Sequence, residues 1–355
     1  MGKYYESNNV TVFQDSNKWN TNFKKEIKMY DRVVRNYTLF NIPWKQKKGK
    51  NAFIYPTPII TLLEGKSALF NLKVEIEELP KKLTLEFKDK DASKYLSLNV
   101  QQISDLSKGK HTKANYLKIS CTKAFETMQT LYVKADGEIC GAIKIHPNST
   151  NFQKKINVVF IKVKTDVNGT DIVGTFTFGG DSFFKKCLNQ ALVIPNLVLE
   201  SKKLDCTGNV LWNTFKHKFC TYGAIAKNKN GYKVTDNDGL REYLEEQLQD
   251  QFGDKYKGYY TVFFIGEKAN WNGFSYFNSK FGVYFDGHNR GTLAHELMHA
   301  MTLAHTFDGV SPTAKFTYEA MKTDNIMDYS HNAKPPIDRK VIYHWQWKIL
   351  NNKIK

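Results

Sequence analysis

The most constraining feature of the sequence is the segment 292–305, which reads Thr-Leu-Ala-His-Glu-Leu-Met-His-Ala-Met-Thr-Leu-Ala-His. In a helix, His295 and His299 lie one turn apart on the same face, so both imidazoles can bind one metal ion. Glu296 lies about 100° around the helix, off the ligand face but within reach of a water on the metal. His305 can join the other two only if the chain leaves the helix and turns back.

Three protein ligands with one open position are typical of catalytic zinc, whereas structural zinc has all four positions filled by the protein. The residues therefore predict a Zn²⁺ site formed by His295, His299 and His305. Bound zinc lowers the pKa of its water to about 7 and polarises a carbonyl group. We expect Glu296 to take the proton from the zinc-bound water and to pass it to the leaving amine.

A second motif follows at 325–330, which reads Asn-Ile-Met-Asp-Tyr-Ser. Together, H-E-x-x-H-x-x-x-x-x-H and M-x-Y resemble the metzincin zinc metallopeptidases, and the pappalysin-like branch is the most similar. The resemblance is strong over the two motifs and extends by layout alone over 185–355. It implies that Met327 forms a turn beneath the metal and that Tyr329 lies near it, able to hydrogen-bond an oxyanion. A core methionine and an ordinary buried tyrosine are the alternatives.

Thr302 departs from the pattern of that family, which has glycine at this position. Glycine allows the positive φ that ends the helix and returns the third ligand to the site. A β-branched residue at positive φ is an outlier. We therefore expect the helix to end after about Met301, and either the turn is built differently or Thr302 is strained.

The rest of the chain predicts a multidomain protein. Residues 1–50 are a polar N-terminal extension with a short helix at Asn20–Arg35 and a linker-like run at Lys45–Lys50. Residues 51–168 read as an all-β sandwich of immunoglobulin-like type, because short segments alternate apolar and polar residues between turn signals. The clearest of these segments are 68–76, 83–87, 131–135, 142–145 and 158–163.

Residues 169–355 predict an α+β domain of metzincin-like layout. We expect a helix from Ser182 to about Leu192 capped by Asp181, and a second helix at Leu240–Phe252 opened by Asp238 or Gly239. Strands are expected at Tyr259–Ile265 and within Phe274–Phe285. The metal-binding helix, capped by Asn289 or Thr292, follows, and a last helix is expected at about Ile337–Leu350. The resemblance implies an edge strand at Asn272–Ser279, to which a peptide substrate would add as a further strand.

Composition limits the compartment and the partners. The five cysteines form no C-x-x-C pair; Cys121 could pair with Cys140 and Cys206 with Cys220, or all could be free thiols. The sequence has no apolar run of transmembrane length and no apolar segment typical of a signal peptide at its start. We expect secretion by a route without such a leader, removal of a leader, or an intracellular protein.

The formal net charge of +17 fits an anionic surface partner, or a solvated, lysine-rich surface. The lysines are spread along the chain and no nucleic-acid motif accompanies them. The resulting hypothesis is a zinc-dependent endopeptidase that acts on proteins or peptides. The alternatives are a catalytically inactive zinc domain that serves as a binding or assembly module, and a zinc amidase acting on cell-wall peptides. Both the endopeptidase and the amidase would be consistent with a secreted bacterial toxin or effector.

Overall fold

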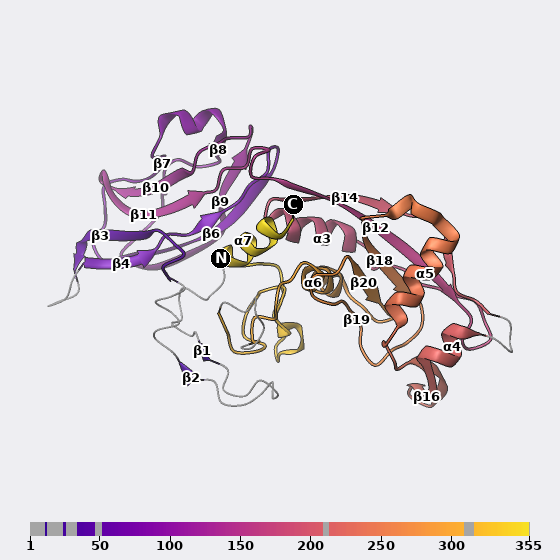
Figure 1. Ribbon diagram of the computed structural model, residues 1–355. Coiled ribbons are helices and arrows are strands. Elements are labelled where there is room, and N and C mark those ends of the chain that lie inside the picture. The colour runs from indigo at the N-terminus through magenta and orange to yellow at the C-terminus, as the bar shows by residue number, and fades with distance from the viewer. Residues whose placement is uncertain are drawn as a thin grey trace.

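The computed structural model describes residues 11–12, 24–25, 34–46, 52–208, 213–308 and 316–354. The described chain is mixed α/β, with many strands and few helices. Figure 1 shows an N-terminal group of strands, drawn in purple, beside a larger part built on a second sheet. The long strand β12 (Lys154–Thr165) belongs to that second sheet.

The N-terminal part is a sandwich of two sheets. Its strands are β5 (Ile59–Ile60), β6 (Ser67–Ile76), β7 (Leu83–Phe87), β8 (Leu96–Leu98), β9 (Gly109–Cys121), β10 (Gln129–Ala135) and β11 (Glu138–Ile145). One sheet has the order β5-β11-β10-β7 and the other β6-β9-β8. Leu85, Leu131 and Ile145 of the first sheet share one buried core with Leu117 and Ile119 of the second. All pairs are antiparallel except β5–β11, which is parallel.

The second sheet carries the candidate site. It contains β12, β13 (Ile172–Val173), β14 (Val193–Leu199), β15 (Leu204–Asp205), β18 (Tyr260–Ile265), β19 (Gly273–Phe274) and β20 (Phe281–Tyr284). The strands β14, β15 and β18 pair in parallel with β12, and β20 pairs in parallel with β18. β19 closes one edge antiparallel to β20.

Helices cover both faces of this sheet. On one face, Val158 and Phe160 of β12 pack in a core with α3 (Gly180–Asn189) and α6 (Arg290–Ala300). On the other, Val159 and Ile161 pack in a core with α4 (Thr214–Phe219) and α5 (Leu240–Phe252). Because successive side chains of a strand point to opposite faces, the apolar run of β12 fills both cores.

The assignment of 158–163 to the N-terminal sandwich was therefore wrong. This segment is the centre of β12 and pairs with β14 and β18. Its residues Val158 to Ile161 are all at most 1% exposed. Such a strand needs cover on both faces, which a parallel sheet between helices provides. The other four predicted strands, and the strand at Tyr259–Ile265, are confirmed with small shifts at their ends.

Two predicted helices differ from the structure in their limits. The last helix, α7, spans His344–Lys353 rather than 337–350, because Lys340 and Val341 are extended and hydrogen-bonded to the segment around Asp324. α3 begins after Gly179, whose φ is 69°, and Asp181 lies in its first turn rather than at the cap. The helix α5 has the predicted limits, with Gly239 as its N-cap.

The predicted helix at Asn20–Arg35 lies mostly outside the described residues. Within it, Lys24–Lys25 is a short strand, β2, which pairs with β1 (Thr11–Val12). Further along, β3 (Leu39–Gln46) pairs with β4 (Ala52–Pro56), so the linker-like run begins inside a strand. A buried cluster then joins this N-terminal region to the C-terminal one; its members are Tyr37, Ile59, Phe316, Tyr318, Tyr343 and Trp345.

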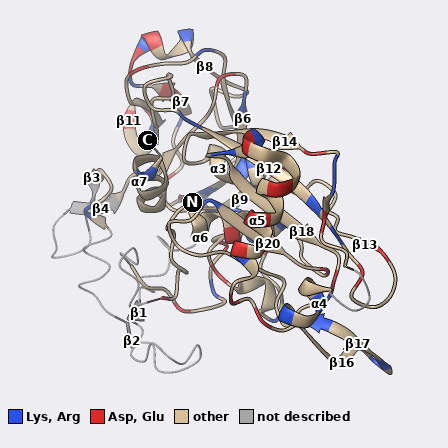
Figure 2. Cartoon of the chain, turned by 45° about the vertical axis from the view of Figure 1, so that its right-hand side comes forward, with Lys and Arg blue, Asp and Glu red and all other residues tan. Residues whose placement is uncertain are grey.

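The five cysteines are free thiols in the structure. Burial raises the pKa of Cys187, Cys206 and Cys220 to about 12. No helix among the described residues is long and apolar enough to cross a membrane. In Figure 2, Lys and Arg are distributed over many elements of both parts.

Phe160 offers a test of the core between the sheet and α3. Its ring is 1% exposed and lies 5.2 Å from that of Phe264 and 6.1 Å from that of Phe184. Phe160→Ala should lower the free energy of unfolding by about 3–5 kcal/mol, because a cavity replaces the ring. The control Phe178→Ala, at a fully exposed ring, should change it by less than about 0.5 kcal/mol. Equal midpoints in urea for the two variants would contradict this packing.

Candidate metal centre

The helix α6 starts at Asn289, one of the two predicted caps. The Asn289 side chain accepts hydrogen bonds from the backbone N–H groups of Gly291 (2.8 Å) and Thr292 (3.0 Å), and the Thr292 hydroxyl accepts one from the Asn289 N–H (3.4 Å). These bonds form a capping box, which satisfies N–H groups that the first turn leaves unpaired. The cap fixes where α6 begins and so which of its residues face the site.

The helix ends in a Schellman motif centred on Thr302. The Thr302 N–H donates to the His299 carbonyl (2.8 Å), and the Leu303 N–H donates to the Met298 carbonyl (2.9 Å). Thr302 has φ of 75°. It thus adopts the conformation that glycine would supply, at a cost of about 1–2 kcal/mol for a residue with a Cβ. Of the two alternatives, strain at Thr302 is the one found, and the turn returns the chain to the site.

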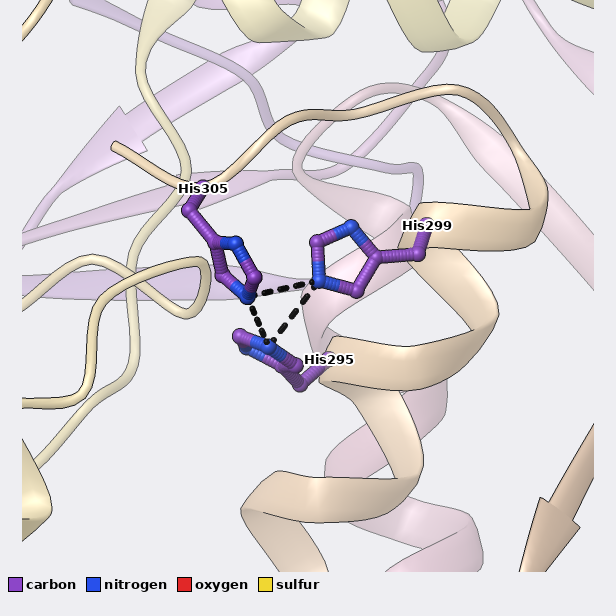
Figure 3. A group of neighbouring side chains, drawn as sticks. All are labelled: His295, His299 and His305. Carbon is purple, nitrogen blue, oxygen red and sulfur yellow. Dashed lines mark hydrogen bonds between the residues drawn. The ribbon is translucent and has the colours of Figure 1, made fainter. Parts of the chain in front are cut away.

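The three predicted histidines come together at one point, as Figure 3 shows. Their Nε2 atoms lie 3.1 Å (His295 to His299), 3.0 Å (His299 to His305) and 3.2 Å (His295 to His305) apart. His295 and His299 are buried and His305 is partly buried. They form a group of side chains that could hold a metal ion.

Backbone carbonyls fix the tautomers of the two helical histidines. The Nδ1 of His295 is 2.8 Å from the Ile326 oxygen, and the Nδ1 of His299 is 2.6 Å from the Leu303 oxygen. A carbonyl only accepts, so each Nδ1 carries the proton and each Nε2 a lone pair. The 3.1 Å between these two Nε2 atoms is therefore a contact of two lone pairs. A shared cation removes their repulsion.

Burial keeps the three imidazoles neutral. It lowers the pKa of His295 and His305 well below the ordinary value and that of His299 to about 4. The neighbouring histidines lower the pKa of His295 and His305 further. Neutral imidazole is the form that binds metal ions, so the site is ready for a cation at neutral pH.

Met327 lies in a turn that contacts His295. The Asp328 N–H donates to the Asn325 carbonyl (3.1 Å), which closes the turn. The Ile326 carbonyl of this turn accepts from His295, and the Met327 carbonyl accepts from the Thr306 N–H (3.1 Å). Met327 is fully buried in the same core as α6. The predicted turn therefore contacts both His295 on the helix and the chain beside His305.

A buried arginine, which sequence reasoning missed, supports this turn. Arg339 is 5% exposed, and its Nη1 donates to the carbonyls of Asp328 (2.8 Å) and Ile326 (3.3 Å). The Asp328 carboxylate accepts from the N–H groups of Met321 and Thr323, each at 2.8 Å. Arg339 lies in a polar stretch with no recognisable spacing from the motifs, so nothing in the sequence could have singled it out.

Asn325 and Gln346 fix the other side of the turn. The Asn325 side chain accepts from the Met327 N–H (2.9 Å) and donates to the Gln346 Oε1 (2.7 Å). Both side chains are fully buried. Asn325 stood inside the second motif, so its position was visible in the sequence, whereas its partner on α7 was not.

Glu296 lies partly buried beside the histidines. Burial raises the pKa of its carboxyl group to about 8, and the charge of Arg339 acts in the opposite direction. The Glu296 carbonyl accepts a hydrogen bond from the Ser275 hydroxyl. A Cβ on Gly273 would lie 2.9 Å from the Val283 oxygen and 3.4 Å from the Glu296 Cγ. The segment around β19 therefore packs closely against α6 at Glu296.

The predicted edge strand at Asn272–Ser279 is confirmed in its place but is shorter. Only Gly273–Phe274 forms β19, at the edge of the sheet and antiparallel to β20. Beyond it, the ring of Phe277 meets that of His299 edge-on, with centroids 5.5 Å apart. Phe277 is 48% exposed, so an apolar surface lies directly beside the histidines.

Tyr329 lies at the site beside His295 and His305. Its ring centroid is 5.4 Å from that of His295 and 4.8 Å from that of His305. Burial, with the charge of Glu296, raises the pKa of its hydroxyl above the ordinary value. The phenol of Tyr329 therefore stays protonated and can donate a hydrogen bond. On the other ligand, the ring of Phe307 stacks on that of His305, with centroids 4.8 Å apart.

Three other polar residues near the motif, His288, His331 and Asp308, lie outside the group of three histidines. The Nδ1 of His288 hydrogen-bonds the Phe285 carbonyl (2.8 Å). The ring of His331 contacts that of Tyr329. The Asp308 N–H donates to the His305 carbonyl (3.2 Å), and its charge raises the pKa of His299 slightly against the effect of burial. Within the described ranges, only His295, His299 and His305 form a group with metal-ligand geometry.

No protein-family model and no curated protein matches this sequence. The geometry of the site is therefore the basis for inferring its function.

The strain at Thr302 can be measured by comparing small residues. Thr302→Gly should be about 1 kcal/mol more stable to urea than Thr302→Ala, because alanine retains the Cβ that penalises positive φ. At an ordinary helical position the order is reversed, and glycine is about 1 kcal/mol less stable. The matched control is Glu246, an exposed residue of α5, replaced by Gly and by Ala. If alanine is the more stable residue at both positions, the strain is refuted.

Proposed function

We propose that this chain is a zinc-dependent endopeptidase of metzincin type, with a β-sandwich module of immunoglobulin-like kind ahead of the peptidase domain. The observation that carries the proposal is the triad of neutral imidazoles whose Nε2 atoms lie 3.0–3.2 Å apart. Tetrahedral zinc, with bonds of about 2.0–2.1 Å to imidazole, sets its ligands about 3.3 Å apart. Small movements of the rings would suffice to accommodate it.

The choice of zinc rests on the donor set. Three neutral nitrogen donors, with no carboxylate among them, suit zinc and disfavour magnesium or calcium, which prefer oxygen ligands. Three protein ligands also leave a position open, as in catalytic rather than structural zinc sites. When bound, zinc would act as a Lewis acid that activates water and polarises a carbonyl group.

Glu296 would act as the general base and acid. It is adjacent to the first ligand, and its side chain is only partly buried, which leaves it open to a water molecule. Its burial-raised pKa of about 8 would be lowered by a cation beside it. A carboxylate there can remove the proton of the attacking water and later deliver it to the leaving amine.

Tyr329 and β19 would position the substrate. The protonated phenol can donate a hydrogen bond to the scissile carbonyl oxygen as negative charge develops on it. β19 is an edge strand, so an extended peptide could pair with it and place its backbone beside Glu296. The exposed ring of Phe277, which contacts His299, would favour an apolar substrate side chain next to the cleaved bond.

The alternative of an inactive binding module rests on Thr302, the residue that departs from the glycine of the family pattern. Because Thr302 adopts the positive φ that returns His305 to the other ligands, this residue gives no geometric reason to expect loss of the metal. The amidase that acts on cell-wall peptides would use the same residues, so its distinction from an endopeptidase depends on substrate.

Elemental analysis tests the metal. The purified chain should contain about one zinc per molecule, and His305→Ala should lose most of it. The control His217→Ala changes an exposed histidine on α4 and should retain the zinc. A chain that stays free of zinc after incubation with the ion, or a His305→Ala variant that binds it as tightly, would contradict the three-histidine site.

Glu296→Gln tests the catalytic role. The variant should retain zinc, because Glu296 is not a ligand, and should cleave casein at least about a hundredfold more slowly. Digestion of casein and of purified cell wall by the unchanged chain is run in parallel. Cleavage of cell wall alone would favour the amidase, cleavage of neither would favour the binding module, and unreduced casein cleavage by the variant would exclude the proposed role of Glu296.

A further inference from the structure

The hairpin of β16 (Cys220–Ala226) and β17 (Lys229–Val234) stands apart from the main sheet. Within the described chain, the two strands form a sheet of their own. Figure 1 and Figure 2 show the hairpin beside α4 at the end of the molecule away from the N-terminal sandwich. A two-stranded sheet has two edges, and the state of each edge can be read from its hydrogen bonds.

The β17 edge is closed. The Asn168 side chain accepts from the Tyr232 N–H (2.7 Å) and donates to the Tyr232 carbonyl (3.1 Å). Further along, the Val234 N–H donates to the Lys268 carbonyl (2.8 Å), and the Val234 carbonyl accepts from the Asn270 N–H (3.3 Å). Both polar backbone groups of Tyr232 and of Val234 therefore point away from β16 and have partners.

Among the residues that the structure describes, none pairs with the centre of the β16 edge. Tyr222 lies opposite Tyr232, and because the backbone groups of Tyr232 point outward, this is a pair without hydrogen bonds between its members. The N–H and C=O of Tyr222 then point outward on the other edge, as do those of Ala224 two residues on. At the start of the strand, the outward N–H of Cys220 is taken by the Lys216 carbonyl.

The composition of β16 makes this edge unusual. Its seven residues, Cys-Thr-Tyr-Gly-Ala-Ile-Ala, carry no charge, and none of them is buried. Tyr222 is 65% exposed. Proteins normally protect an open edge strand with charged side chains, proline or a bulge within the strand. The regular part of β16, up to Ala224, has none of these, so its exposed backbone is suited to receive another strand.

The surroundings of β16 are strongly basic. Residues 213–235 contain five lysines and no Asp or Glu; the lysines are Lys216, Lys218, Lys227, Lys229 and Lys233. None of them forms an ion pair with a residue of the described chain. Asp236 and Asp238 follow only after β17, and there the Asp238 N–H donates to the Asp236 carboxylate. Two acidic groups from neighbouring elements act on this region, Glu242 on Lys218 and the buried Glu267 on Cys220. Because the five lysines outnumber them, an added strand would still enter a region with an excess of positive charge.

We infer that the open edge of β16 binds an extended acidic segment of another protein by strand addition. The backbone groups of Tyr222 and Ala224 would supply the pairing, and the lysines around the hairpin would select acidic side chains. Pairing of two copies of this chain through β16 is opposed by the same charge, because it would bring two sets of five lysines together. The inference does not depend on the proposed peptidase activity.

Binding is measured by fluorescence anisotropy with the full-length Glu296→Gln variant, which excludes loss of signal by cleavage. The probe is a short labelled peptide of alternating Glu and Thr, compared with one of alternating Lys and Thr. The acidic peptide should bind and the basic one should not. Ala224→Pro removes one outward N–H without breaking a ladder bond and should weaken binding at least about tenfold. The matched control Ala224→Ser retains that N–H and should bind as before.

A second pair of variants separates local from general charge. Lys227, Lys229 and Lys233 are replaced together by Glu, and the control replaces Lys66, Lys88 and Lys123, which are exposed on the sandwich. Both variants lower the net charge equally, but only the first should abolish binding. In the unchanged hairpin, the peptide should slow hydrogen exchange at Tyr222 and Ala224, which requires no variant to fold.

Several outcomes would overturn the inference. Equal loss in the two lysine variants would mean that only overall charge acts. Strand addition would be excluded if the Ala224→Pro variant unfolded at an unchanged temperature and still bound the peptide as tightly. It would also be excluded if the peptide left amide hydrogen exchange at Tyr222 and Ala224 unchanged. Equally tight binding of a single-stranded oligonucleotide or of anionic vesicles would exclude a preference for acidic peptides, and dimers that Ala224→Pro disrupts would assign the edge to a second copy.

Discussion

Two hydrogen bonds determine the direction of the candidate metal ligands. The Nδ1–H groups of His295 and His299 donate to the carbonyls of Ile326 and Leu303. These bonds leave the lone pairs on Nε2 and prevent each ring from turning away. Neither carbonyl belongs to α6, so the helix supplies the imidazoles while two loops orient them. Such outer contacts fix ring orientation at metal sites generally. Here they turn the Nε2 lone pairs of His295 and His299 toward each other, an arrangement that a shared cation would stabilise.

The two loops are held by different means. The Leu303 carbonyl is placed by the Schellman motif, in which Thr302 is strained by about 1–2 kcal/mol. The Ile326 carbonyl is held by a hydrogen bond from the buried Arg339, and the Ile326 N–H donates to the Val341 carbonyl. Strained residues persist only where the surroundings determine their conformation. At Thr302, the two bonds of the Schellman motif and the burial of Met301 and Leu303 in the core supply that restraint.

The sheet gives the site its open side. α6 packs on one face, while β19 forms the sheet edge beside Glu296 and leads to the exposed ring of Phe277. A chain that supplied only the triad could bind a metal, but an edge strand beside it also offers a place for an extended ligand. The hairpin at the far end of this part has a second open edge with a different chemical character, uncharged within the strand and basic around it.

Local residue patterns were sufficient to predict the two candidate ligands four residues apart, the start of α6 at Asn289 or Thr292, the limits of α5 and most of the strands. Spacing and capping act over a few residues, so these features can be read locally. The sequence left open whether Thr302 would be strained, since backbone energy alone favours another turn. Contacts between distant segments place 158–163 in the second sheet, start the last helix at His344 and bring Arg339 to the turn at Ile326. These depend on pairing and burial between segments far apart in the chain, which local residue patterns do not encode.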